Sequence, residues 1–174
     1  CSHRWFSAQK DRLLSPKWLE NFKEKGSIDE QRDEEELLDI LQSVSHKQPE
    51  KYVFVDMDHD GAKELIATIS SNGNLFQIWY CSNDGKTCQQ IHSTSEDMDG
   101  CDIEVLDLGT ETHIAINAYC MMGTRKSYSI LSLNNKKISC LLMNQNGYVS
   151  MDEIGNILLN VEAYDSIYDT SVGD

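Results

Sequence analysis

The sequence of 174 residues predicts a mainly β protein of the α+β class, with an N-terminal pair of helices and an antiparallel β-meander. Helical patterning stops near residue 48, and after it short runs of β-branched and aromatic residues alternate with turns rich in Asn, Asp and Gly. The strand pattern also repeats weakly, with a period of about 50 residues. We therefore expect a helical segment at 1–48 that packs on a β-meander domain at 49–174, as one compact domain overall.

The two helices are expected from capping signals and apolar stripes. Ser15 and Pro16 have the order of an N-cap and a first helical residue, and Gly26 ends that helix. A capping box at residues 27–30 opens a second helix, which should stop before Pro49. Its core face combines four apolar residues at helical spacing, namely Leu37, Leu38, Leu41 and Val44.

Residues 51–70, KYVFVDMDHDGAKELIATIS, place an acidic turn between two apolar runs. The acids and the glycine of this turn are Asp56, Asp58, Asp60, Gly61 and Glu64. A hard cation such as Ca²⁺ needs about 6–8 oxygen ligands, and Gly61 allows the positive φ of a turn that curls around the ion. The runs YVFV and LIATI favour strands, and Ala67 stands where a helix–loop–helix calcium site needs Glu. The sequence therefore predicts a cation site in the turn of a β-hairpin.

The stretch VFVDMDHDGAKELI resembles the D-x-D-x-D-G-x-x-[DE]-L loop of FG-GAP/VCBS-type repeats, which occur in integrin-like β-propellers and in many bacterial surface proteins. The resemblance covers about twenty residues. It implies calcium as cofactor, with four side-chain ligands and one backbone carbonyl: Asp56, Asp58, Asp60, Glu64 and Ala62. Magnesium fits less well, because it keeps its waters. A metal-free acidic turn is the alternative, but four carboxylates about 5 Å apart would repel by roughly 1 kcal/mol per pair even in water.

Strand pairs are expected after this hairpin, and they repeat its pattern. The predicted strands are 74–81, 87–92, 101–108, 113–119, 127–133, 137–143, 148–151 and 157–161. The segment CDIEVLDLGTETHIAINAY begins a second unit, and a third unit from Tyr148 is incomplete. Asp107 corresponds to Asp56, but the D-x-D-G core is absent there, so this second loop should not bind calcium. The period suits propeller-blade-like repeats, and two complete units predict an open or curled sheet because they cannot close a ring.

The six cysteines follow no metal-binding spacing such as C-x-x-C. Cys81 and Cys88 bracket Asp84-Gly85, and they would lie opposite each other on paired strands if those two residues form the turn. A disulfide between them is then expected in an oxidising compartment, and two reduced thiols are the alternative. Cys1 is a candidate lipidation site, although the residues after it lack the polar tether typical of a lipoprotein.

The net charge of −14 argues against nucleic acid and anionic membranes as partners, because both attract Lys and Arg. No apolar run approaches the roughly 18 residues of a membrane span. The remaining nucleophile candidate is Cys120 with His92 or His113, but no known nucleophile motif surrounds it, so we expect no catalytic residue.

These observations favour a non-catalytic, calcium-stabilised binding module of a bacterial surface or secreted protein, located outside the cell or at its surface. Its expected partner is an unidentified protein or glycan. One alternative is a cytoplasmic acidic inhibitor or immunity-type protein, and another is an accessory domain or hydrolase with no recognisable motif. The cellular compartment distinguishes the surface module from the cytoplasmic inhibitor. Extracellular calcium is at about millimolar concentration and can fill weak sites, whereas a cytosolic calcium site must bind more tightly.

Overall fold

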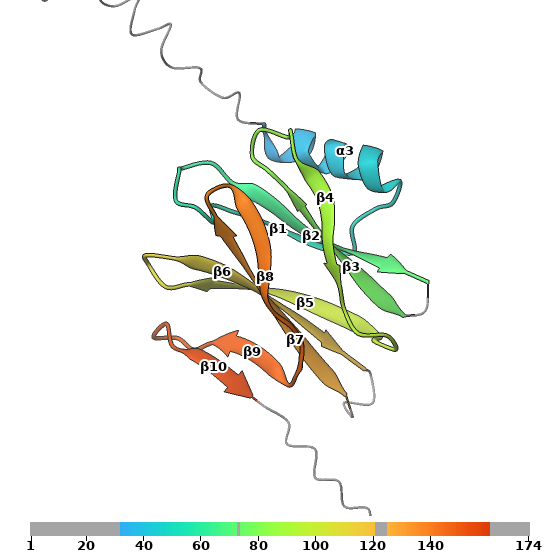
Figure 1. The fold of residues 1–174 in the computed structure, drawn as a ribbon, viewed down its shortest axis with the longest axis vertical. Coiled ribbons are helices and arrows are strands. Elements are labelled where there is room, and N and C mark those ends of the chain that lie inside the picture. The colour runs from blue at the N-terminus through green and yellow to red at the C-terminus, as the bar shows by residue number, and fades with distance from the viewer. Residues whose placement is uncertain (1–31, 73, 121–124, 161–174) are drawn as a thin grey trace, which may run out of the picture. The chain divides into compact units, whose positions relative to one another are not determined.

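The computed structural model describes residues 32–72, 74–120 and 125–160 (Figure 1). All described residues belong to one compact unit, which begins at Arg32. This unit contains α3 (Glu34–Ser45), β1 (Lys51–Val55), β2 (Glu64–Ser71), β3 (Leu75–Cys81), β4 (Cys88–Ser93), β5 (Gly100–Asp107), β6 (Thr112–Tyr119), β7 (Lys126–Asn134), β8 (Lys137–Asn146), β9 (Tyr148–Met151) and β10 (Ile157–Asn160).

The expected α+β class with an N-terminal helical pair is wrong, because the described chain is mostly antiparallel β-sheet with a single helix. That helix, α3, begins after Asp33 and not at the capping box of residues 27–30. The Asp33 backbone is extended and its carboxylate accepts a hydrogen bond from Glu36 N at 2.8 Å, which satisfies a free N–H of the first turn. The predicted first helix, the capping box and Cys1 lie outside the described residues.

Strands that follow one another in sequence pair antiparallel, so each sheet is a meander. The first sheet has the order β1-β2-β3-β4, the second β5-β6-β7-β8, and β9 pairs with β10 in a third. The first strand of each sheet begins at residue 51, 100 or 148, close to the period of about 50 residues that the sequence predicts. Hairpin turns between neighbouring strands therefore gather at two opposite ends of each sheet.

The main core lies between the two four-stranded sheets, which stack face to face with β1 against β5 and β4 against β8. Alternation along the strands supplies this core with one face of each sheet. Its most buried side chains include Ile66, Ile78, Ile114, Ile116 and Leu131. Burial of such aliphatic side chains stabilises the fold by about 1.5–3 kcal/mol each.

The outer face of each sheet is covered by another element. Helix α3 places Leu37 and Leu41 against Leu65, Ala67 and Ile69 of β2. The β9–β10 hairpin covers the outer face of the second sheet, where four buried residues meet: Leu106, Ala115, Tyr128 and Val149. The described unit is therefore built of four layers, with both faces of each four-stranded sheet at least partly covered (Figure 1).

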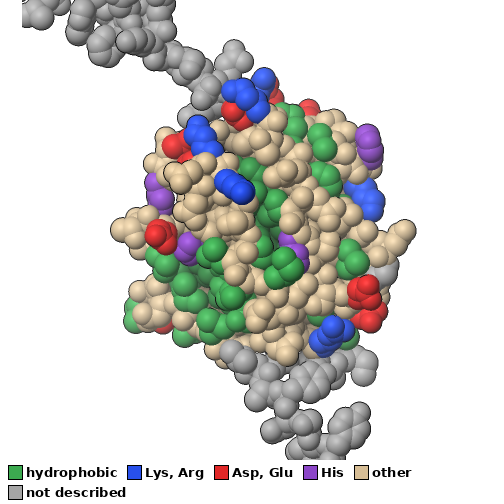
Figure 2. All heavy atoms as spheres, viewed as in Figure 1, with side chains coloured by type: hydrophobic (Ala, Val, Ile, Leu, Met, Phe, Trp, Pro, Cys, Tyr) green, Lys and Arg blue, Asp and Glu red, His purple; other side chains and the backbone are tan. Residues whose placement is uncertain are grey.

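Some apolar side chains remain exposed at the margins of these layers. Val44, which was expected on the core face of the helix, is 48% exposed. The β9–β10 hairpin leaves Ile154, Leu158 and Leu159 exposed, and Figure 2 shows hydrophobic side chains gathered over this hairpin at the lower left. The hairpin therefore has one apolar side against the sheet and further apolar groups in contact with solvent.

Truncation of a buried side chain of α3 should lower the stability of the fold. Leu41 is fully buried between α3 and the first sheet, so Leu41→Ala should lower the free energy of unfolding by about 2–5 kcal/mol. Urea denaturation of both proteins measures the difference. The matched control is Val44→Ala on the exposed side of the same helix, which should change stability by less than about 0.5 kcal/mol. Equal effects of the two substitutions would contradict the packing of α3.

Candidate metal centre

Three carboxylates converge in the turn between β1 and β2. Val55, at the end of β1, pairs with Glu64 at the start of β2, so residues 56–63 form the turn. Ligand oxygens of Asp56, Asp58 and Glu64 all lie within 4.8 Å of one another. Because Ca²⁺ binds oxygen at about 2.3–2.6 Å, one cation can contact all three. Among the described residues no other group of three acidic, His or Cys side chains meets in this way.

The turn holds the first carboxylate in a fixed orientation. Asp56 accepts hydrogen bonds from Asp60 N to Oδ1 at 3.1 Å and from Gly61 N to Oδ2 at 2.9 Å. Gly61 has φ 89° and His59 has φ 58°, so the chain passes twice through the left-handed region that glycine adopts without strain. The predicted role of Gly61 in curling the turn is thus visible in its backbone.

Glu64 is the buried member of the triad, with 2% of its surface exposed. Its Oε2 accepts a hydrogen bond from Met57 N at 2.9 Å. Burial raises the pKa of Glu64 to about 7, and the negative charges of Asp58, Asp60 and Asp56 add to this rise. A positive ion in the turn would favour the charged carboxylate, because it opposes both effects.

Asp58 supplies an independent indication that the turn accommodates a cation. Its Oδ1 atom is buried and has no hydrogen-bond partner among the described residues. A buried oxygen without a partner costs free energy, and a metal ion at the centre of the triad would satisfy it. The donor set of the turn therefore fits a cation that prefers carboxylate oxygens.

The other two predicted ligands lie differently. Asp60 is exposed; its Oδ1 accepts a hydrogen bond from Ala62 N at 2.9 Å, and Asn83 Nδ2 lies 3.3 Å from its Oδ2. This carboxylate therefore links the turn to the β3–β4 turn and stands apart from the triad. Ala62 is buried in the same turn, and its carbonyl remains a predicted ligand.

Sequence reasoning missed the contacts that hold the acidic turn from outside. Asn83 reaches Asp60, and Lys63 forms an ion pair with Glu34 of α3 at 2.9 Å. In a meander, the β1–β2 and β3–β4 turns lie at the same end of the sheet, so the approach of Asn83 could have been inferred from the strand order. The ion pair between Lys63 and Glu34 has no comparable local signal.

Cys81 and Cys88 are directly opposite each other on β3 and β4, and the structure joins them in a disulfide. Three other described cysteines carry free thiols, namely Cys101, Cys120 and Cys140. The disulfide closes the β3–β4 hairpin immediately beside Asn83 and thus beside the acidic turn.

The histidines considered as partners of a cysteine nucleophile have other neighbours. His92 Nε2 lies 3.1 Å from Ser129 Oγ, and His113 Nε2 lies 3.3 Å from Glu111 Oε2. Ser129 is 2% exposed and His92 is half-buried, so their contact is a polar link between β4 and β7 of the two sheets. The His59 side chain is exposed, and its Nε2 lies 3.2 Å from Thr112 Oγ1.

Comparison of the chain with protein-family models, with curated proteins and with solved structures finds no significant match. The class of the protein is therefore defined by its own features, which are stacked antiparallel meanders and one acidic turn that can hold a metal ion. Within the described residues, no helix has the length and apolarity needed to cross a membrane.

The metal-free protein should lose stability as the pH rises, because folding raises the pKa of Glu64 from 4.5 to about 7. A raised pKa stabilises the fold below pH 4.5 and this contribution disappears as the pH passes 7, a change of roughly 3 kcal/mol. Urea denaturation in EDTA at several pH values measures the slope. Glu64→Gln should remove this component, whereas Glu153→Gln at an exposed position should retain it. Identical slopes for the wild type and Glu64→Gln would contradict the burial of an ionisable carboxyl.

Proposed function

We propose that the protein is a non-catalytic, calcium-stabilised binding module of a surface or secreted protein, and that the cation has a structural role. The observation that carries this proposal is the triad of Asp56, Asp58 and Glu64, in which one oxygen is buried without a partner and one carboxyl is almost fully buried. The resemblance of residues 53–66 to FG-GAP/VCBS-type calcium loops supports the same conclusion.

The chemistry of the donors favours calcium. All three converging ligands are carboxylates, which suit hard cations such as Ca²⁺ and Mg²⁺ better than zinc or copper. Ca²⁺ accepts about 6–8 ligands in flexible geometry, so backbone carbonyls and water can complete an irregular turn of this kind. Mg²⁺ requires a near-ideal octahedron and releases water reluctantly, which fits the turn less well.

The cation would stabilise the β1–β2 hairpin at one edge of the first sheet. β2 begins at Glu64 and its first six residues are all buried, so a cation that holds this carboxylate would also hold the start of the buried part of β2. Neutralisation of the clustered charge removes the repulsion that would otherwise open the turn. The partner would then bind to the surface of the stabilised sheets, and not to the cation itself.

The disulfide supports a location outside the cytoplasm. Cys81 and Cys88 are joined next to the acidic turn, and disulfides persist mainly in oxidising compartments. Extracellular calcium at about millimolar concentration would occupy even a weak site of this type.

Calcium should raise the melting temperature of the protein. At about 100 times its Kd, a ligand stabilises the folded state by about 2.7 kcal/mol, which corresponds to a shift of roughly 5–10 °C for a domain of this size. Differential scanning calorimetry with calcium and with EDTA measures the shift. Asp58→Asn should abolish it, and Asp97→Asn, an exposed aspartate with positive φ, should leave it intact. No shift of the wild type at millimolar calcium would overturn the proposal.

Protein made in an oxidising compartment should contain the Cys81–Cys88 bond. Mass spectrometry after alkylation without reduction should recover a linked peptide, and replacement of both cysteines by Ser should cost about 2 kcal/mol of stability. Complete alkylation of both thiols would instead favour the cytoplasmic inhibitor as the function.

A further inference from the structure

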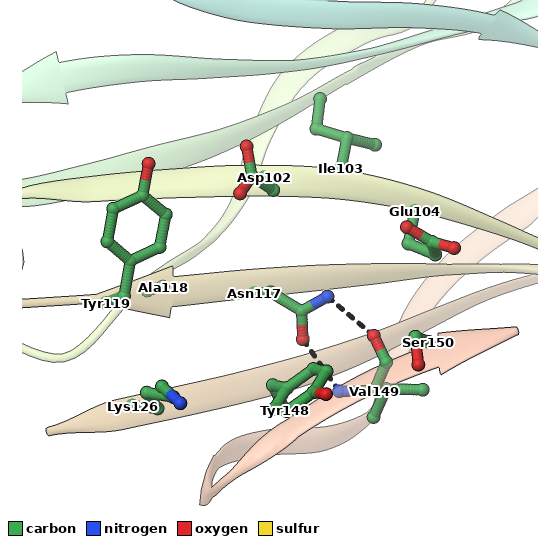
Figure 3. Close-up of a pocket in the computed structure, with 10 residues that line it drawn as sticks. All are labelled: Asp102, Ile103, Glu104, Asn117, Ala118, Tyr119, Lys126, Tyr148, Val149 and Ser150. Carbon is green, nitrogen blue, oxygen red and sulfur yellow. Dashed lines mark hydrogen bonds between the residues drawn. The ribbon is translucent and has the colours of Figure 1, made fainter. Parts of the chain in front are cut away.

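A second feature of the molecule is a groove on the outer side of the second sheet, at the opposite face from the first sheet (Figure 3). It has a volume of about 550 Å³ and is lined by residues of β5, β6, β7 and β9. Sites for small molecules have volumes of about 300–1,000 Å³, so the groove is large enough for a ligand of two or three rings.

Asn117 determines the shape of the groove. Its side-chain amide donates to Val149 O at 2.7 Å and its Oδ1 accepts from Val149 N at 2.9 Å, so one side chain holds the edge of β9 against β6 (Figure 3). Gly147 N, beside it, donates to Lys126 O at 3.1 Å. These backbone groups at the β9 edge are occupied, so a peptide strand that added to this edge would lack partners for them.

Two tyrosines supply aromatic surface to the groove. The Tyr119 ring lies against Gly100, where a Cβ atom would come within 2.7 Å of its Cζ, so the absence of a side chain at Gly100 sets the position of this ring. On the other side, the Lys126 ammonium lies 5.3 Å from the centre of the Tyr148 ring. Figure 3 shows that the two rings come from different strands, Tyr119 from β6 and Tyr148 from β9.

Charges of both signs are balanced around the groove, although the protein as a whole carries −14. Asp102 and Glu104 supply two carboxylates from β5. Lys51 forms an ion pair with Asp102, and Lys126 lines the groove from β7. The Asp102 carboxylate is paired with Lys51, so an anionic ligand would meet Glu104 and a cationic ligand would meet Lys126; this balance favours a neutral ligand with many hydroxyl groups.

We propose that this groove binds a neutral oligosaccharide, an inference that rests on the proposed binding function and names its ligand. Tyr119 and Tyr148 line the groove, and the parts of their rings that Gly100 and Lys126 leave uncovered offer apolar surface for the C–H groups of a sugar ring. Asp102 and Glu104 can accept hydrogen bonds from sugar hydroxyls, and Ser150 can both donate and accept. The two tyrosines, the two carboxylates and Ser150 all line one groove, whereas on an ordinary polar surface such groups are scattered.

The test begins with the full chain in calcium on an array that carries neutral oligosaccharides of glucose, galactose, mannose and N-acetylglucosamine, together with sialylated and sulfated glycans. The strongest neutral glycan is then titrated by calorimetry, and amide shifts are recorded by NMR. We expect a neutral glycan to bind and to shift resonances of Asn117, Tyr119, Tyr148 and Ser150.

Three variants sharpen this test. Tyr148→Ala should weaken binding about tenfold, and Glu104→Gln, which keeps the shape of a partly exposed side chain, about fivefold. Tyr52→Ala is the matched control, because this tyrosine is 50% exposed on β1 outside the groove; it should change affinity less than about twofold. Melting temperatures with calcium verify that each variant is folded.

Binding of no neutral glycan, shifts confined to residues outside the groove, or preferential binding of anionic glycans would each overturn the inference. These outcomes are distinguishable from failure of the proposed function. A calcium-dependent melting shift without glycan binding removes only the groove inference. Glycan binding in the groove without a calcium effect removes only the role of the metal.

Discussion

Repulsion among carboxylates in the β1–β2 turn is the constraint on which the first sheet depends. Asp56, Asp58 and Glu64 bring oxygens within 4.8 Å of one another, and Glu64 is almost fully removed from water. Without a cation, the turn can relieve this repulsion by binding a proton or by opening. Burial raises the pKa of Glu64 to about 7, and the charges of the neighbouring aspartates add to the rise. A bound cation relieves the repulsion while all three carboxylates stay charged, so the metal and the hairpin stabilise each other.

The position of the β1–β2 turn explains why the repulsion among its carboxylates affects other parts of the fold. β2 is buried on both faces, with Leu65 against α3 and Ile66 in the core between the sheets, and a slip of one residue would exchange these faces. Lys63 connects the turn to Glu34 of α3, and Asp60 connects it to Asn83 beside the disulfide. The acidic turn therefore joins three elements that the sequence separates by tens of residues.

Features that depend on local sequence could be predicted, and those that depend on distant contacts could not. The hairpin around Gly61 follows from apolar runs on both sides of a turn, and the opposition of Cys81 and Cys88 follows from the turn between them. The expected helical pair was wrong, since the described chain contains the single helix α3, and Asp33 caps its start. The groove depends on two hydrogen bonds between the Asn117 side chain and the backbone of Val149, 32 residues away. The periodicity of apolar residues in the sequence does not predict such a contact.

The most direct test of the central claim is a crystal structure grown in calcium, with data collected at a wavelength where calcium scatters anomalously. We predict one anomalous peak in the β1–β2 turn, about 2.3–2.6 Å from oxygens of Asp56, Asp58 and Glu64. The Asp58 oxygen that is buried without a partner should be among its ligands. A well-ordered turn with no peak at the triad, or a peak held by other residues, would contradict the account.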